Sequence, residues 1–250
     1  MVSSRDMETN KTSDKYFLPI AVIVAGVLIA GAVIWNGQHP TPTTGSPQAA
    51  GTGAAPSVDI KNVKTDGEPF IGQANAPVTI AFWSDYQCPY CKAFEVGGVT
   101  GIPTPAAMPD IIKNYVNTGK VKIVFKDFAF IGNDSITGGE YGRAIWKLYP
   151  DKYFAWRTAM YNAQDQENAG FGNTASIDKL DATIPGIDAA KVAADVKANA
   201  STYQALMDAD KAEAGKLGVN ATPSFIIGTQ LLAGAYPYAT FKAAIDPLLK

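Results

Sequence analysis

The chain has few of the residues that bind metals or exchange protons near neutral pH. Its 250 residues include two cysteines and one histidine. A structural zinc site needs four ligands, so two cysteines alone do not make one. The histidine, His39, lies in a stretch of small and polar residues, where a solvated side chain is expected. The formal net charge is −2 and no basic stripe is present, so nucleic acid is not an expected partner.

Long apolar runs are also scarce, and the one that stands out is near the N-terminus. Residues 17–35 carry no charge, and a helix of that length spans about 29 Å, close to the hydrocarbon thickness of a bilayer. Basic residues precede the run, and none follows before Lys61. This bias predicts a single-pass anchor in the cell membrane, with residues 1–16 as a short cytoplasmic tail. Cleavage at Ala30-Gly31-Ala32 is the alternative, although the length of the run and Trp35 favour an uncleaved anchor.

The remaining sequence divides into a linker and a folded domain. Residues 36–57 are mostly Gly, Pro, Ser, Thr and Ala, a composition typical of a flexible linker. Residues 58–250 are predicted to fold outside the cytoplasm as an α/β domain. Strands are predicted at 78–83, 121–125, 224–227 and 231–233, and helices at 110–117, about 140–217 in several pieces, and 238–249. Asp188 and Ser201 are predicted to be the N-caps of two Ala-rich helices.

The two cysteines form the motif Cys88-Pro89-Tyr90-Cys91, where a predicted strand turns into a helix. A thiolate at a helix N-terminus is stabilised by free backbone N–H groups and the helix dipole, which lowers its pKa. Pro89 suits the first turn of the helix, because its missing N–H is not needed there. The spacing favours thiol–disulfide exchange, with Cys88 as the exposed attacking sulfur and Cys91 as the buried resolving one. A purely structural disulfide is the less favoured interpretation, because closing so short a loop adds little stability.

Four blocks of sequence together resemble the DsbA-like branch of the thioredoxin superfamily, in particular its membrane-anchored bacterial members. They are Ala76–Ile80 with Ser84–Lys92, Gly119–Val121 with Phe125–Phe128, Gly218–Phe225, and Pro237–Phe241. The resemblance implies a thioredoxin fold with a helical domain inserted between its second and third strands. It also implies a cis bond between Thr222 and Pro223, facing the sulfurs, with no cofactor beyond the Cys88–Cys91 disulfide.

The same resemblance implies an extracytoplasmic enzyme that introduces disulfides into exported proteins. Its expected partners are the thiols or disulfides of those proteins and a quinone-linked membrane oxidase of the DsbB or vitamin-K-epoxide-reductase type. A reductase or isomerase kept reduced by a membrane electron donor is an alternative, and a non-catalytic binding module or chaperone is another. We expect a monomer, since nothing in the chain resembles a dimerisation domain.

Two departures from the family pattern concern the environment of the cysteines. Phe82 stands where many relatives carry a buried glutamate, so Asp85, Glu95 or water is expected to take over any proton relay. The residues between the cysteines are Pro89 and Tyr90, without an imidazolium, so Cys88 should be acidified mainly by the helix terminus. Its pKa is expected below about 8.5 but above about 3.5. Thr222 is expected to direct its hydroxyl towards Cys88.

Overall fold

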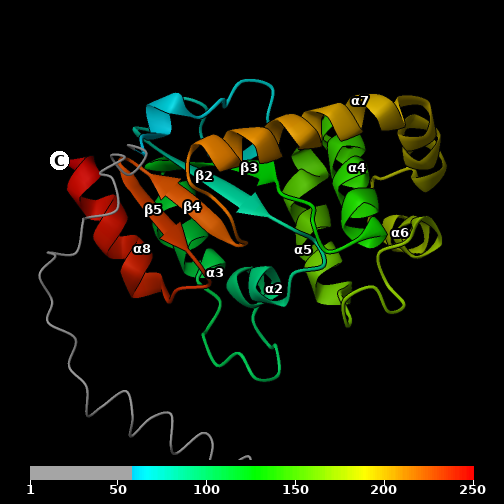
Figure 1. Cartoon of the computed structure of the whole chain (residues 1–250), viewed down its shortest axis with the longest axis horizontal. Helices are drawn as coiled ribbons and strands as arrows, with labels where there is room; N and C mark the ends of the chain where they lie inside the picture. The colour runs from blue at the N-terminus through cyan, green and yellow to red at the C-terminus, as the bar shows by residue number, and fades with distance from the viewer. Residues whose placement is uncertain (1–57) are drawn as a thin grey trace, which may run out of the picture. The chain divides into compact units, whose positions relative to one another are not determined.

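A five-stranded sheet forms the centre of the computed structural model, which describes residues 58–250 (Figure 1). Strand β2 (Val78–Ser84) pairs in parallel with β3 (Val121–Asp127) and antiparallel with β4 (Ser224–Ile227). The outer strands are β1 (Phe70–Ile71), antiparallel to β3, and β5 (Gln230–Ala233), antiparallel to β4. The order is β1-β3-β2-β4-β5, so the strand that leads into the cysteine motif is central.

Alternate side chains of β2 enter two separate apolar clusters, because successive residues of a strand point to opposite faces of its sheet. Val78, Ile80 and Phe82 belong to the larger cluster, whereas Ala81 and Trp83 belong to the smaller one. The helices whose side chains join the larger cluster beside the sheet are α2 (Pro89–Glu95), α3 (Met108–Ile111) and α8 (Tyr238–Ile245). Both faces of the sheet are therefore covered, as expected of an α/β domain.

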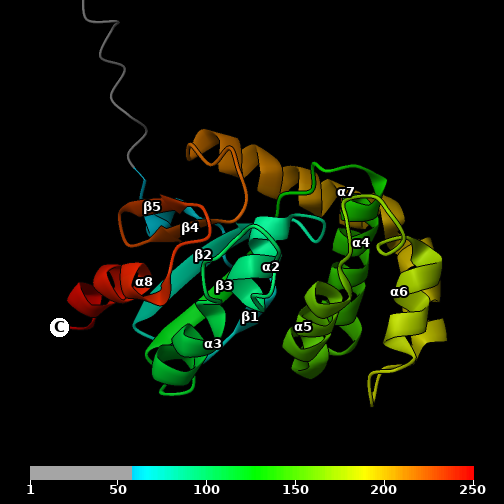
Figure 2. The ribbon, with the colours of Figure 1, turned by 90° about the horizontal axis from the view of Figure 1, so that it is seen from below.

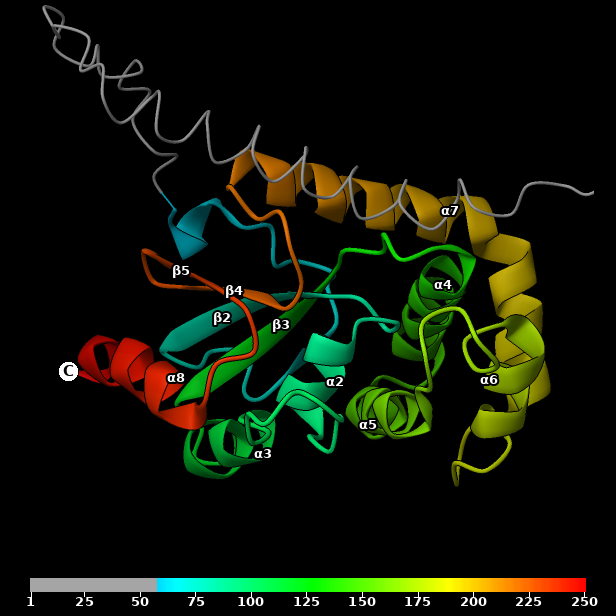
Figure 3. The ribbon, with the colours of Figure 1, turned by 60° about the horizontal axis from the view of Figure 1, so that its bottom comes forward.

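Between β3 and β4 the chain forms the predicted helical insert. Its helices are α4 (Asn133–Leu148), α5 (Tyr153–Ala163), α6 (Thr174–Asp181) and α7 (Ala189–Lys216). The first three gather beside the sheet, and α7 runs back from them across it (Figures 1 and 3). Helix α7 contacts α4, α6 and β3, so it joins the insert to the sheet. The insert is confirmed, and it starts somewhat earlier than the predicted residue 140.

Several local predictions differ from the structure. The two predicted Ala-rich helices are one, α7: Asp188 caps its start by accepting from Lys191 N–H (3.1 Å), whereas Ser201 lies exposed inside it. No Gly or Pro lies near Ser201 to break the helix. Strand β1 was not predicted because it is only two residues long. The shorter helical turns are η1 (Ile60–Asn62), η2 (Ile112–Val116, a π-helix), η3 (Pro150–Lys152) and η4 (Asp246–Leu249).

The predicted tail, anchor and linker, at residues 1–16, 17–35 and 36–57, lie outside the residues that the structure describes. His39 and the alternative cleavage site fall there too. Within residues 58–250, no helix is both long and apolar enough to cross a membrane.

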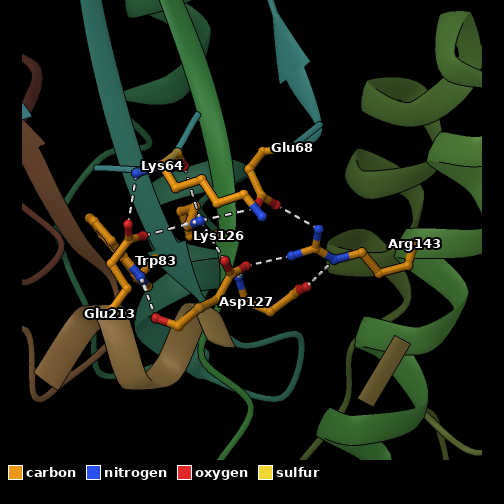
Figure 4. Close-up of polar contacts among 8 residues, drawn as sticks. Lys64, Glu68, Trp83, Lys126, Asp127, Arg143 and Glu213 are labelled. Carbon is orange, nitrogen blue, oxygen red and sulfur yellow. Dashed lines mark hydrogen bonds and ion pairs between the residues drawn. The ribbon is translucent and has the colours of Figure 1, made fainter. Parts of the chain in front are cut away.

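A buried network of charged side chains fastens the insert to the sheet (Figure 4). Arg143, on α4, pairs with Glu68 (2.6 Å), Asp127 (2.6 Å) and Asp210. Lys126, on β3, pairs with Asp210 (2.5 Å), Glu68 (3.1 Å) and Glu213 (3.1 Å). Both cations are almost fully buried, so each depends on these carboxylates in place of water. The network spans the segment before β1, strand β3, α4 and α7.

Candidate active site

The cysteine motif begins four residues after β2 ends, and Cys88 is the N-cap of α2 with Pro89 at its first turn. Both thiols are free in this structure. Cys91 is fully buried, as predicted, but Cys88 is only 4% exposed, so the prediction of an exposed Cys88 is wrong. Cys88 is buried because a segment far along the chain packs against it. The Cys88 thiol faces the residues just before β4 and donates to the carbonyl oxygen of Thr222 (3.4 Å).

The two thiols have opposite acidities. The pKa of Cys88 is lowered to about 7, chiefly by a hydrogen bond from the Cys91 thiol, against the effect of burial. Thr222 and the backbone N–H groups of Cys91 and Tyr90 lower it further. The pKa of Cys91 is raised well above its ordinary value, first by burial and then by that same hydrogen bond. The pKa of Cys88 lies within the expected range. The hydrogen bond from the Cys91 thiol lowers this pKa more than the N–H groups at the helix terminus do.

Thr222 and Pro223 approach the cysteines from the start of β4, and the bond between them is cis, as the resemblance implied. The hydroxyl oxygen of Thr222 is buried and has no hydrogen-bond partner within residues 58–250. It is therefore available to the Cys88 sulfur when that sulfur carries a negative charge. The supporting role predicted for Thr222 and Pro223 stays a prediction, now with the geometry that it requires.

Asp85 anchors the loop that follows β3. Its carboxylate accepts four hydrogen bonds, from the N–H groups of Gln87 (2.8 Å), Phe130 (2.9 Å) and Ile131 (3.2 Å) and from the hydroxyl of Ser135 (2.6 Å). Burial nevertheless raises its pKa. Within residues 58–250, no hydrogen bond joins this carboxylate to either sulfur. The proton-relay role of Asp85 therefore stays a prediction, whereas the structure shows that Asp85 holds the loop after β3 in place.

Glu95, at the other end of α2, is buried and pairs with Arg157 of α5 (2.7 Å). Its second oxygen has no hydrogen-bond partner among the described residues. Burial raises the pKa of Glu95, while the attraction of Arg157 opposes this rise. The Arg157 guanidinium also donates to Ser84 (2.7 Å) and, at a longer distance, to the hydroxyl of Tyr161 (3.4 Å). Glu95 thus belongs to a buried polar group beneath the motif, and its predicted relay role is untested.

Phe82 fills the place of the missing buried acid with an apolar contact. It is fully buried, and its ring lies 4.5 Å from that of Phe225 and 5.1 Å from that of Phe94, centroid to centroid. The guanidinium of Arg157 lies 5.1 Å from the Phe82 ring and 4.3 Å from the Phe125 ring. A cation against aromatic faces is favourable when it is shielded from water. The sequence did not signal this buried arginine.

Three exposed aromatic residues lie in the cysteine motif or in segments that are hydrogen-bonded to Asp85 or Pro223 beside it. Tyr90 (53% exposed) lies between the cysteines, and Phe130 (51%) lies in the loop fastened by Asp85. Tyr236 (40%) follows Gly234, whose N–H donates to the carbonyl oxygen of Pro223 (2.7 Å). Sequence reasoning named Tyr90 but missed the other two, because long-range contacts place them here. Exposed aromatic side chains near a reactive site can contact a bound polypeptide.

Among residues 58–250, no group of three or more His, Cys, Asp or Glu side chains is arranged to hold a metal ion.

Comparison with known proteins agrees with this fold. "Disulfide bond formation protein D" of Bacillus subtilis is 24% identical over 184 residues, covering 74% of this chain and 78% of its own. "Probable disulfide bond formation protein D" of Bacillus anthracis is 28% identical over 182 residues, covering 72% and 77%. The crystal structure of oxidised BdbD from B. subtilis superposes with a TM-score of 0.63 at 22% identity, covering 78% of this chain and 97% of that one. That of the thiol-disulfide exchange protein α-DsbA2 from Wolbachia pipientis gives 0.59 at 27% identity, covering 72% and 87%.

The fold, the buried dithiol and these relatives define a DsbA-like thiol–disulfide oxidoreductase. The chain belongs to the thioredoxin family, whose model matches residues 64–247.

Proposed function

We propose that this enzyme works as an oxidant, introducing disulfide bonds into exported proteins through Cys88 and Cys91. The observation that carries the exchange chemistry is the pair of acidities: the pKa of Cys88 lies near 7, and that of Cys91 is strongly raised. At neutral pH about half of the reduced molecules would hold a reactive thiolate on Cys88. This acidity does not set the direction of exchange, because a reducing thioredoxin has a similar pKa of about 7. The oxidising direction is inferred from the two Bacillus relatives, which are disulfide bond formation proteins by name.

The reaction starts from the oxidised enzyme, with a disulfide between Cys88 and Cys91. A substrate thiolate attacks the Cys88 sulfur, the enzyme disulfide breaks, and Cys91 leaves with the electron pair and takes up a proton. A second substrate thiolate then attacks the substrate sulfur of the mixed disulfide, and Cys88 leaves as a thiolate. The substrate loses two electrons and gains a disulfide, and the enzyme gains two electrons.

Four neighbours would support these steps. Pro89 and Tyr90 belong to the helix turn whose N–H groups face Cys88, and the hydroxyl of Thr222 can donate to the Cys88 thiolate. Pro223, next to Thr222, has no N–H that would compete for the sulfur. Asp85 or Glu95 would be the group that moves the proton to and from Cys91. The exposed rings of Tyr90, Phe130 and Tyr236 suit apolar side chains of unfolded substrates.

The proposed setting is the outer side of the cell membrane, with residues 17–35 as the anchor and residues 36–57 as the tether. There the reduced enzyme would be reoxidised by a quinone-linked membrane protein. The support is the charge pattern around the apolar run and the restriction of cysteine to the one pair.

The reduction potential of the Cys88–Cys91 couple separates the oxidant from its alternatives. We expect a value between about −120 and −200 mV in a glutathione redox titration of the full chain. A pKa near 7 stabilises the thiolate less than a pKa near 3.5 does, so the couple should be a weaker oxidant than one at about −120 mV. A potential near −270 mV would contradict the oxidant role and favour a reductase.

A further inference from the structure

The loop after α5 is fastened directly to the cysteine motif. The side-chain amide of Gln164 donates to the carbonyl oxygens of Tyr86 (2.7 Å) and Cys88 (3.2 Å). In return, the Lys92 ammonium donates to the carbonyl oxygen of Gln164 (2.6 Å). These bonds cross between the insert and the sheet domain, so this part of the insert is held as a wall of the active site. In Figures 2 and 3, α5 is the insert helix that stands next to α2.

Gln87 extends this connection further along the loop. Its amide donates to the carbonyl oxygen of Phe171 (3.1 Å), and its side-chain oxygen accepts from the N–H of Asn168 (2.9 Å). Gln87 is only 2% exposed, so both bonds are shielded from water. The segment 164–171 is therefore held in place relative to the cysteines by the side chain of Gln164 itself and by those of Gln87 and Lys92 from the cysteine motif.

A groove of about 710 Å³ lies between this wall, the start of α2 and the loop after α2. Pro89, the residue next to Cys88, lines it, and residues 98–100 form part of the opposite wall. A cavity of this volume is in the range that encloses a drug-sized ligand or a few residues of an extended peptide. A polypeptide joined to Cys88 in a mixed disulfide has its neighbouring residues within reach of this groove.

The charges in the groove favour a basic occupant. Asp165 and Glu167 line it, against the single ammonium of Lys92, which already donates to Gln164. The Asp165 carboxylate is held in place, because one of its oxygens accepts from the N–H groups of Gly170 (2.9 Å) and Phe171 (3.1 Å). Both acids are exposed, so they can pair with a partner without a large desolvation cost.

We infer that this groove binds the substrate segment next to the reactive cysteine and favours segments carrying Lys or Arg over those carrying Asp or Glu. The inference rests on the proposed function, since it names the substrates that the oxidant would oxidise fastest. None of the exposed aromatic residues Tyr90, Phe130 and Tyr236 lines this groove.

The test compares two reduced peptides that share the same cysteine pair and differ only in having Lys or Glu on both sides of it. The oxidised full chain is assayed with each peptide at low and high salt, and kcat/KM is measured. We expect the Lys peptide to react about fivefold faster than the Glu peptide at low salt, with the ratio shrinking at high salt because the charges are screened. The double variant Asp165→Asn/Glu167→Gln should reduce the low-salt ratio by about threefold.

The matched control removes the same charge elsewhere. Asp66→Asn/Asp208→Asn changes two exposed acids that do not line the groove, and it should keep the wild-type ratio. Comparing ratios between enzymes cancels the intrinsic reactivity of each peptide. An equal ratio in the wild type and the groove variant would overturn the inference while leaving the oxidant intact. If the wild type oxidised neither peptide, the proposed function itself would fail.

Discussion

Replacement of Cys88 by alanine is expected to lower the rate of disulfide transfer to a dithiol peptide by at least about a thousandfold. Cys88 has the lowered pKa, and Cys91 is fully buried with a raised pKa, so the remaining thiol is a poor nucleophile. The chain has no third cysteine that could substitute. The measurement is the rate of peptide oxidation by the full chain, after incubation of each enzyme with an oxidant.

Cys91→Ala is the informative counterpart, because it keeps the attacking sulfur and removes the resolving one. Given a peptide that already carries a disulfide, this variant should accumulate a mixed disulfide visible by mass spectrometry, because the Cys88 thiolate attacks the peptide disulfide, one peptide sulfur leaves as a thiolate, and no Cys91 is present to release the adduct. The Cys88→Ala enzyme should form no such adduct. If Cys88→Ala kept the activity of the wild type in cells, the binding-module alternative would replace the enzymatic account.

The second large effect concerns stability: Arg143→Met should lower the free energy of unfolding by about 3–5 kcal/mol. Methionine fills a similar space but leaves Glu68, Asp127 and Asp210 buried without this cation. Urea unfolding followed by circular dichroism measures the change. The matched control is Lys147→Met, which removes an exposed cation from the same helix and its surface pair with Asp195 (2.7 Å). Exposed pairs contribute about 0–1 kcal/mol, so the control should be nearly as stable as the wild type.

The loss in Arg143→Met should also depend on pH. Burial raises the pKa of Asp210 to about 7, so the native state keeps a proton that the unfolded chain releases near pH 4. This group therefore makes the protein less stable as the pH rises from about 4 to 7. Arg143 opposes the rise of that pKa, so its removal matters most when Asp210 is ionised. The difference between variant and wild type should be smallest near pH 5 and largest near pH 8; a constant difference would contradict this account of the network.

The cysteine motif could be placed from the sequence because its geometry is local. A buried strand, a short turn and a helix with Pro89 at its start follow from residues that are adjacent in the chain. The same holds for the insert, whose helical pattern is continuous enough to be read without tertiary contacts. The sequence predicts two helices where the structure has the single helix α7, because Ser201 is of a residue type typical of an N-cap, although a serine alone does not end a helix.

What the sequence could not reveal depends on residues far apart in the chain. The burial of Cys88 comes from Thr222, 134 positions later, and Gln164 reaches Cys88 from 76 positions away. Glutamine at the end of a helix carries no pattern that predicts such a contact. The pairing of Arg157 with Glu95 also follows only from the packing of α5 on α2. The groove likewise exists only because two distant loops meet.

The dependence of cysteine alkylation on pH, measured on the reduced full chain, tests the central claim most directly. Iodoacetamide should modify Cys88 with a half-maximal rate near pH 7, while Cys91 stays unmodified in the folded protein, as read from the mass of each cysteine peptide. In the Cys91→Ala variant the midpoint for Cys88 should move to higher pH, because the hydrogen bond that lowers this pKa most is gone. Equal reactivity of both cysteines with a midpoint near 8.5–9, that of a free thiol, would contradict the account.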